Sequence, residues 1–439
     1  MSPNTLYAGF ARQNITPDCS MPLGGYGNAM GRFSEKVLDD LYLTCVAITS
    51  GEETILMYTG DILSFSNDML VQIRAAVTKA TGISGEKTYF TATHTHSAPA
   101  LMEDNEYSER YRNTVAAAAV VTAKDALADR APATLLTTTK RIPGMNFIRN
   151  YLMGDGSYSG SSFGSSESGY IGHAGMTDPR MILVQLKRQD KASVVLMNWQ
   201  AHNDNVPEVG YRNISSSYVG KIRKKFEAET GMLFFYVAGA SGNQVVNSKV
   251  PAERHSLTWT QYGYRLAEDM IEALPKLQEV EGTAIKTLHV ELEVPANHAW
   301  DHMLPQAQEV VDLWLSGNDR KPADALAPTY GFSSAYHANA VISLAKQPEN
   351  LTLELNAFTI GDLAFITSTN EAFSEVGLHV RAYAPYDTVV FVAGNRGYLP
   401  SATAYDYRSY EADTSLYAKG ACERVSAEMV RMLQELKNA

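Results

Sequence analysis

The chain has 439 residues, enough for a large buried core, and its hydrophobic content of 45% with 19% charged residues excludes a disordered protein. The net charge of −11 and the lack of a Lys- or Arg-rich run argue against nucleic acid as a partner, because phosphate binding needs clustered positive charge. The three cysteines, Cys19, Cys45 and Cys422, form no C-x-x-C pair, which argues against a disulfide framework and a thiolate zinc site.

Membrane insertion and secretion are also disfavoured. No apolar run reaches the roughly 18 residues that a membrane-spanning helix needs. Residues 1–5 have neither the basic start nor the apolar stretch of a signal peptide. We therefore expect a cytoplasmic protein that acts on a small molecule, while its oligomeric state is not indicated.

The first third of the chain predicts alternating strands and helices. Two paired strands lie within 40–60 and are joined by a turn that begins at Gly51. The apolar spacing over 66–81 predicts a helix that Gly82 ends. A strand at 88–92 and an Ala-rich helix at 107–128 follow. This order favours a mixed sheet with helical cover.

A Gly- and Ser-rich excursion occupies 154–169. Its composition is typical of a flexible surface loop, and a lid over a site is the alternative.

The remainder continues the same pattern. Strands are expected at 181–186, 193–199, 233–237, 351–358, 363–367 and 388–392, and helices at 213–229, 258–274, 371–384 and 414–437, with a polar and mainly helical stretch at 300–346. No repeat or linker is present in the sequence. We therefore predict one α/β domain over 1–439.

His94 and His96 follow the strand at 88–92 directly. In an extended segment, residues i and i+2 point to the same face, so both imidazoles could meet one metal ion. Sites in α/β sheets also gather past the carboxyl ends of strands. A lone His-x-His is equally compatible with a hydrogen-bonded histidine pair.

Three further residues could complete a metal site, and each has a simpler explanation. His202 follows an apolar strand and could be structural; Glu371 could cap the start of a helix; Tyr398 could pack in the core. Together with His94 they form a nitrogen and oxygen donor set that suits zinc and leaves a position for water, although manganese and iron are not excluded.

The motifs together resemble the catalytic domain of the neutral (alkaline, non-lysosomal) ceramidase family. The resemblance runs from the N-terminus to about residue 420, and the Thr-His-Thr-His-Ser-x-Pro motif at 93–99 is its most specific part. The other matching segments are the Gly-rich start at 8–27, Asn-Trp-Gln-Ala-His at 198–202, Asn-Glu-Ala-Phe at 370–373, and Tyr398 followed by Tyr405, Tyr410 and Glu411.

The resemblance implies that His94, His202, Glu371 and Tyr398 bind one zinc ion per chain. It implies that His96 stands beside the metal as a catalytic residue, and that the reaction is amide hydrolysis. Zinc would activate water and polarise the carbonyl group, while an imidazole could move a proton to the leaving amine.

The chain also departs from the family. The family's Gly-Asp-x-Ser-Pro-Asn segment corresponds to 238–247 here, where Asn243 replaces the Asp and Val245 the Ser, with Ser241 nearby. The C-terminal immunoglobulin-like domain of long ceramidases has no counterpart in the sequence. We therefore expect a substrate other than ceramide, soluble and polar.

Two polar arms, 155–168 and 203–213, could supply contacts to such a substrate, or could simply be solvated loops. The candidate substrate-binding residues are Asn203, Asp204, Arg149, Ser241 and Asn243. Cleavage of an ester, lactone or glycosidic bond at the same site is an alternative. A binding protein that retains a metal pocket is a second alternative, disfavoured because all four expected ligands are present.

Overall fold

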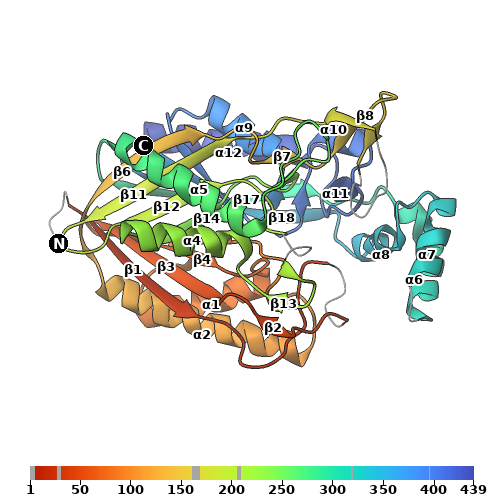
Figure 1. Cartoon of the computed structure of the whole chain (residues 1–439), viewed down its shortest axis with the longest axis horizontal. Coiled ribbons are helices and arrows are strands. Elements are labelled where there is room, and N and C mark those ends of the chain that lie inside the picture. The colour runs from red at the N-terminus through yellow and green to blue at the C-terminus, as the bar shows by residue number, and fades with distance from the viewer. Residues whose placement is uncertain (1–4, 27–30, 161–168, 205–208, 318–319, 395) are drawn as a thin grey trace.

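The computed structural model describes residues 5–26, 31–160, 169–204, 209–317, 320–394 and 396–439. Among these residues a nine-stranded sheet forms the centre of the molecule (Figure 1). Its strands in spatial order are β14 (Leu233–Ala238), β12 (Val194–Trp199), β11 (Arg180–Arg188), β6 (Ala131–Arg141), β1 (Leu6–Asn14), β3 (Tyr42–Ser50), β4 (Glu53–Gly60) and β5 (Thr88–Ala92), with β16 (Gln278–Glu279) paired to β6. The β4–β5 and β12–β14 pairs are parallel and the others antiparallel, so the predicted mixed sheet is confirmed.

A second sheet packs against one face of the first. Its strands are β17 (Ile285–Pro295), β18 (Asn350–Ile360), β19 (Leu363–Ser368) and β21 (Val389–Ala393). Side chains alternate along each strand, so Ile55 and Met57 of β4 face the second sheet while Leu56 and Tyr58 face helices. Between the sheets, the ring of Tyr89 stacks on Phe358 at 4.3 Å between centroids.

Helices cover the outer faces of both sheets, giving four layers. The large sheet is covered by α1 (Asn67–Thr81), α2 (Glu106–Ala128), α4 (Ser217–Thr230) and α5 (Trp259–Ala273), and the second sheet by α9 (Ser374–Tyr383) and α12 (Ala421–Asn438). α1 shows why these boundaries are readable from the sequence. Ser66 caps its start by accepting from the Met69 amide, and Gly82 ends it in the left-handed region at φ 77°.

Three helices form a separate unit at one end of the molecule (Figure 1). They are α6 (Leu304–Leu315), α7 (Lys321–Leu326) and α8 (Ala335–Leu344), within the stretch expected to be helical. This helical unit has an apolar core of its own, in which Val310, Phe332 and Val341 are fully buried.

Several short elements join these layers. They are β2 (Lys36–Val37) with β13 (Asn213–Ile214), β7 (Phe147–Ile148) with β15 (Gln244–Val245), β8 (Tyr151–Met153) with β9 (Tyr158–Ser159) and β10 (Tyr170–His173), β20 (Glu371–Ala372) with β22 (Tyr398–Leu399), and the helices α10 (Ala402–Asp406) and α11 (Tyr410–Asp413). None of the helices formed by the described residues is long and apolar enough to cross a bilayer.

Three predicted helices begin at least three residues later than expected, and one of them is α4, which begins at Ser217 instead of residue 213. Glu371 does not open a helix, because it lies in β20, and α9 begins at Ser374. The last helix begins at Ala421, after Gly420 turns the chain at φ 94°. Of the Gly- and Ser-rich excursion, residues 161–168 lie outside the described residues, as do 205–208 of the second polar arm, so the roles expected of these segments stay predictions.

Candidate metal centre and its cavity

The site forms where strand ends of the two sheets meet. β5 leads to His94, β12 to His202, β19 to Glu371 and β21 to Tyr398. The Thr91 hydroxyl joins the ends of β5, β21 and β14: it donates to the Ala393 carbonyl at 2.8 Å and accepts from the Ala238 amide at 3.2 Å. Residues from distant parts of the sequence are thereby brought to one edge.

His94 adopts an unusual backbone conformation, with φ 58° in the left-handed region. Its neighbours hold this conformation in place. The Thr93 amide donates to the Gly60 carbonyl at 2.8 Å, and the Thr95 hydroxyl donates to the Ser215 carbonyl at 2.7 Å. Such strain in a non-glycine residue is maintained only by surrounding contacts and is frequent at functional sites.

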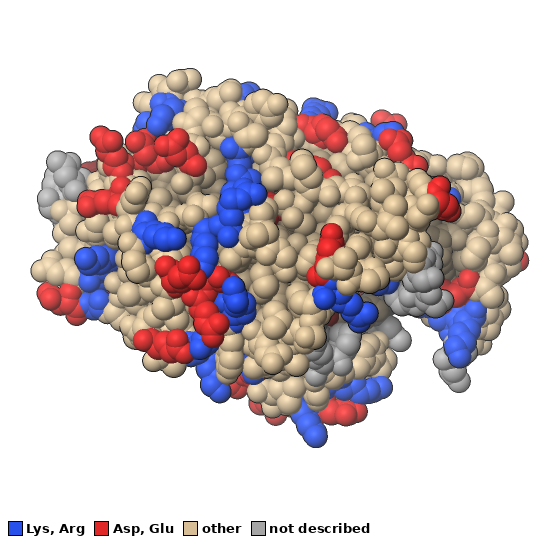
Figure 2. All heavy atoms as spheres, turned by 45° about the horizontal axis from the view of Figure 1, so that its top comes forward, with Lys and Arg blue, Asp and Glu red and all other residues tan. Residues whose placement is uncertain are grey.

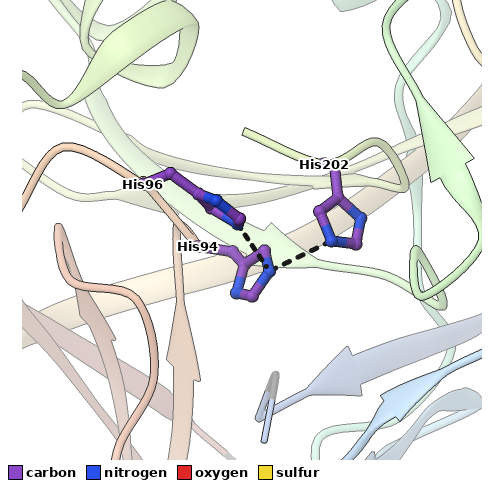
Figure 3. Close-up of side chains that lie close together, drawn as sticks. All are labelled: His94, His96 and His202. Atoms are coloured by element: carbon purple, nitrogen blue, oxygen red, sulfur yellow. Dashed lines mark hydrogen bonds between the residues drawn. The ribbon is translucent and has the colours of Figure 1, made fainter. Parts of the chain in front are cut away.

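The tautomers of His94 and His202 are set by carbonyl groups. The His94 Nδ1 lies 2.9 Å from the Leu63 oxygen, and the His202 Nδ1 lies 2.8 Å from the Ser241 oxygen. A carbonyl oxygen only accepts, so each Nδ1 carries the proton, and in the neutral ring each Nε2 presents a lone pair. These two Nε2 atoms face each other at 3.2 Å (Figure 3).

A carboxylate completes this group of acceptors. Glu371 Oε2 lies 3.4 Å from the Nε2 of both His94 and His202, and it is buried with no hydrogen-bond partner among the described residues. Three electron-rich atoms facing one point repel one another unless a positive charge lies between them. Zinc bonds of 2.0–2.1 Å give tetrahedral edges of about 3.3–3.4 Å, which the separations here match. The donor set therefore fits a zinc ion.

His96 stands beside this group in a different way. Its Nε2 lies 3.3 Å from the Nε2 of His94, so three imidazoles lie close enough for one metal ion. Its Nδ1, however, is buried without a hydrogen-bond partner among the described residues. Metal-binding histidines usually donate from the other ring nitrogen. The tautomer of His96 is thus not fixed as those of His94 and His202 are.

Charges around the centre shift the ionisation of its groups. Burial opposes the charged form of His94, but Glu371 outweighs it, so the pKa of His94 is raised. Burial and the two neighbouring histidines lower the pKa of His96 well below its usual value. The pKa of Glu371 is lowered: its burial is outweighed by His94 and His202. The carboxylate is therefore ionised and a cation beside it is stabilised.

Tyr398 lies opposite Glu371 in the parallel β20–β22 pair. The guanidinium of Arg149 covers its ring at 5.3 Å. Arg149 is buried and donates from Nε to Glu411 Oε1 at 2.6 Å, while Asn150 donates to Glu411 Oε2 at 3.1 Å. Burial raises the pKa of Tyr398, as does Glu371, whereas Arg149 acts in the opposite direction.

A cavity of about 280 Å³ opens on the side of the centre that His96 and Tyr398 occupy. Its other described lining residues are Gly25, Tyr26, Arg149, Asp204 and Tyr410 from the core, and Arg320, Ser334 and Tyr336 from the helical unit. None of these lining residues has an aliphatic side chain. Hydroxyl, guanidinium, carboxylate and aromatic groups therefore make up the wall.

No protein-family model matches the sequence, and no curated protein sequence matches it. Among solved structures, the neutral ceramidase from Pseudomonas aeruginosa superposes with a TM-score of 0.74 at 16% identity, covering 100% of this chain and 75% of that one. A structure described as a ceramidase complexed with C2 superposes with a TM-score of 0.72 at 14% identity, covering 99% and 76%. The chain has the neutral ceramidase fold. The fold expected from the resemblance is thus confirmed.

Within this neutral ceramidase fold, the five candidate substrate-binding residues take different places. Arg149 and Asp204 line the cavity. The Asn203 side chain is buried and donates to the Ser216 carbonyl at 3.2 Å. Ser241 supplies the carbonyl that orients His202. Asn243 holds the start of α9 by accepting from the Ser374 amide at 2.8 Å. The last three are not among the described lining residues.

Six described cavity residues of this neutral ceramidase fold were not expected from the sequence as site residues: Gly25, Tyr26, Arg320, Ser334, Tyr336 and Tyr410. Tyr410 belongs to the Tyr-rich motif, and its ring meets that of Tyr398 edge-on at 5.8 Å between centroids. Tyr336 stacks against Tyr410 from the helical unit at 6.0 Å. The matching motifs contained three of these residues, Tyr410 in the Tyr-rich segment and Gly25 and Tyr26 in the Gly-rich start, and the other three had no signal in the sequence.

Proposed function

We propose that this protein is a zinc-dependent hydrolase that cleaves an amide (N-acyl) bond in a soluble, polar substrate. The observation that carries the proposal is the convergence of His94 Nε2, His202 Nε2 and Glu371 Oε2 at separations of 3.2–3.4 Å beside a cavity. Tyr398 would be the fourth ligand. A zinc ion held there would polarise a carbonyl group and lower the pKa of water.

The other residues of the wall have separable roles in this proposal. His96 moves the proton, because its Nε2 faces the centre and its Nδ1 is not committed to a carbonyl group. Arg149, fixed by Glu411, presents a positive charge to the oxygen of the bond that is cleaved. Tyr26, Tyr336 and Tyr410 offer hydroxyl groups and ring faces that orient the substrate.

The wall of the cavity supports a polar substrate. Its apolar surface comes from tyrosine rings, while Arg149, Asp204 and Arg320 carry charges that a polar substrate can pair with and an acyl chain cannot. On the face shown in Figure 2, acidic and basic side chains are interspersed, which favours a small molecule over nucleic acid as partner. A cytoplasmic location, which the sparse and unpaired cysteines favour, remains part of the proposal and is tested by cell fractionation.

The test combines metal analysis with a substrate panel. Protein purified without added metal is analysed for zinc, manganese and iron, and is then assayed on N-acyl amines, N-acyl amino acids, esters, lactones and aryl glycosides. We expect about one zinc per chain and hydrolysis of an N-acyl compound that a chelator abolishes and zinc restores. Absence of hydrolysis across the whole panel by zinc-loaded protein would overturn the proposal.

A further inference from the structure

Arg32 is a fully buried arginine directly behind the site, with an exposed fraction of 1%. Its hydrogen bonds to described residues all end on backbone carbonyl groups. Nη2 donates to His96 at 2.5 Å, Nη1 donates to Gly24 at 2.8 Å, and Nε donates to Tyr211 at 2.6 Å. One planar guanidinium group therefore joins three chain segments that are far apart in the sequence.

Two tyrosine rings, 6.1 Å apart between centroids, lie against this guanidinium. Tyr26 lies 4.9 Å and Tyr211 4.8 Å from its central carbon. Tyr26 in turn meets the His96 ring edge-on at 5.0 Å between centroids, and both line the cavity. Arg32 thus contacts the ring of Tyr26 and the backbone carbonyl group of His96, and both residues line the cavity.

The His96 ring has little freedom on its other sides. Gly25 has φ 111°, and a Cβ atom at this position would lie 2.7 Å from His96 Cγ, so the backbone itself packs against the imidazole. The His96 amide donates to the Asn203 carbonyl at 3.2 Å. No hydrogen bond among the described residues holds Nδ1 of the ring. The orientation of His96 therefore depends on its backbone and on Gly25 and Tyr26, and Arg32 connects these parts.

We propose that Arg32 is a positioning residue that sets the orientation of His96 and Tyr26 in the wall of the cavity. This inference rests on the proposed hydrolase function. Arg32 makes no contact with His94, His202 or Glu371 among its described hydrogen bonds, so it acts on the proton-transfer and substrate side of the site and not on the metal ligands. A flat, three-point donor that also stacks is a role that lysine cannot fill.

The test compares Arg32→Lys with Arg188→Lys. Arg188 is also buried, donates from Nε to the Ala192 carbonyl at 2.7 Å, and lies at the end of β11 remote from the strand ends that form the site. We expect Arg32→Lys to retain zinc and to lose about 10²-fold in kcat, in line with the effect of small misplacements on catalysis. Arg188→Lys should keep the kcat of the wild type.

A second readout does not depend on activity. In protein labelled with ¹⁵N-histidine, the His96 ring signals are assigned by their loss in His96→Asn. Arg32→Lys should shift or broaden them, and Arg188→Lys should not. If the wild type hydrolyses nothing, the proposed function fails while these signals still test the positioning role.

A milder variant guards against misfolding. Tyr211 is half exposed, so Tyr211→Ala removes one covering ring without opening the core, and a smaller change in the same direction is expected. Unaltered kcat and unaltered His96 signals in the folded variants would overturn the proposal. Loss of zinc from Arg32→Lys would also overturn it, because Arg32 would then support the metal ligands.

Discussion

Glu371 and Tyr398 are direct partners in a parallel pair of two-residue strands, so a carboxylate and a phenol from different strand ends stand side by side. The two histidines that complete the proposed ligand set come from the other sheet, at the ends of β5 and β12. Each sheet thus contributes half of the set. The centre consequently depends on how the two sheets are packed, and its loss would report on that packing as well as on the individual ligands.

The metal assignment predicts that His94→Ala and His202→Ala each lose most of the bound zinc, because each removes a lone pair that faces Glu371. Elemental analysis of protein purified without added metal measures this. His289→Ala is the matched control, since His289 lies on β17 and bonds to Asn356 away from the site. Unchanged zinc in both site variants would refute the assignment.

His96→Ala should keep its zinc and lose turnover. General acid–base catalysis contributes about 10²–10⁴-fold, and we expect a loss of kcat in this range. Zinc content and kcat are measured on the same preparation. A variant without zinc would make His96 a ligand, which its 3.3 Å approach to His94 would also allow.

Tyr398→Phe removes the phenol oxygen and keeps the ring beneath Arg149. If that oxygen binds the metal, zinc affinity should fall by about tenfold or more, the size of effect known for changes near a metal site. Competition with a chelator of known affinity gives the dissociation constant. An affinity equal to that of the wild type would remove Tyr398 from the ligand set.

Long-chain ceramide should be a poor substrate. Its acyl chain would leave polar groups of the cavity wall unpaired, and each such group costs about 1–3 kcal/mol. We expect kcat/KM at least about tenfold below that of the best polar N-acyl compound. Detergent-dispersed ceramide is assayed beside the polar panel, and comparable rates on both would contradict the expectation.

Stability should depend on pH through His337, which lies at the contact between α8 and α11. Burial, aided by Arg408, lowers its pKa to about 3, while Asp413 beside it has a pKa raised to about 6 by burial. The folded chain keeps His337 neutral, whereas the unfolded chain takes up a proton near pH 6.5. The contribution of neutral His337 to the free energy of unfolding is therefore complete above pH 6.5, and it is lost as the pH falls towards 3.

At pH 5 this loss amounts to about 2 kcal/mol. Asp413 acts with the opposite sign between about pH 4 and pH 6, because its carboxyl group ionises more readily in the unfolded chain. Urea unfolding of the wild type and of His337→Gln at pH 7 and pH 5 separates the two effects. His337→Gln should lose less stability between these pH values, and equal losses would show that His337 is not responsible.

Local sequence patterns predicted most of the strands and helices that form the layers. α1 and β5 lie where their spacing and caps place them, because both signals are local. β6 could not be predicted, since its half-exposed side chains give no clear apolar alternation. β17 was missed although Leu288, Val290, Leu292 and Val294 alternate with polar residues, which is the pattern of a half-buried strand. β20 also went unseen, because its two residues become a strand only through pairing with Tyr398 and Leu399.

The convergence of the two histidines was predictable from the sequence, but its structural cause differs from the expected one. His94 and His96 were expected to converge as residues i and i+2 of an extended segment, but His94 has φ 58° and the convergence arises in a turn. The cavity wall was largely unpredictable. Arg320 and Tyr336 lie on segments whose approach depends on packing between distant elements, and no spacing rule reports such contacts.

The helical unit has consequences for how such proteins diverge. It folds around its own apolar core and adds only Arg320, Ser334 and Tyr336 to the described cavity wall, while every proposed metal ligand lies outside it. Changes at these three positions would alter the cavity wall and leave the proposed metal ligands in place. If the proposed function holds, substrate preference could therefore evolve through the helical unit while the metal centre stays unchanged.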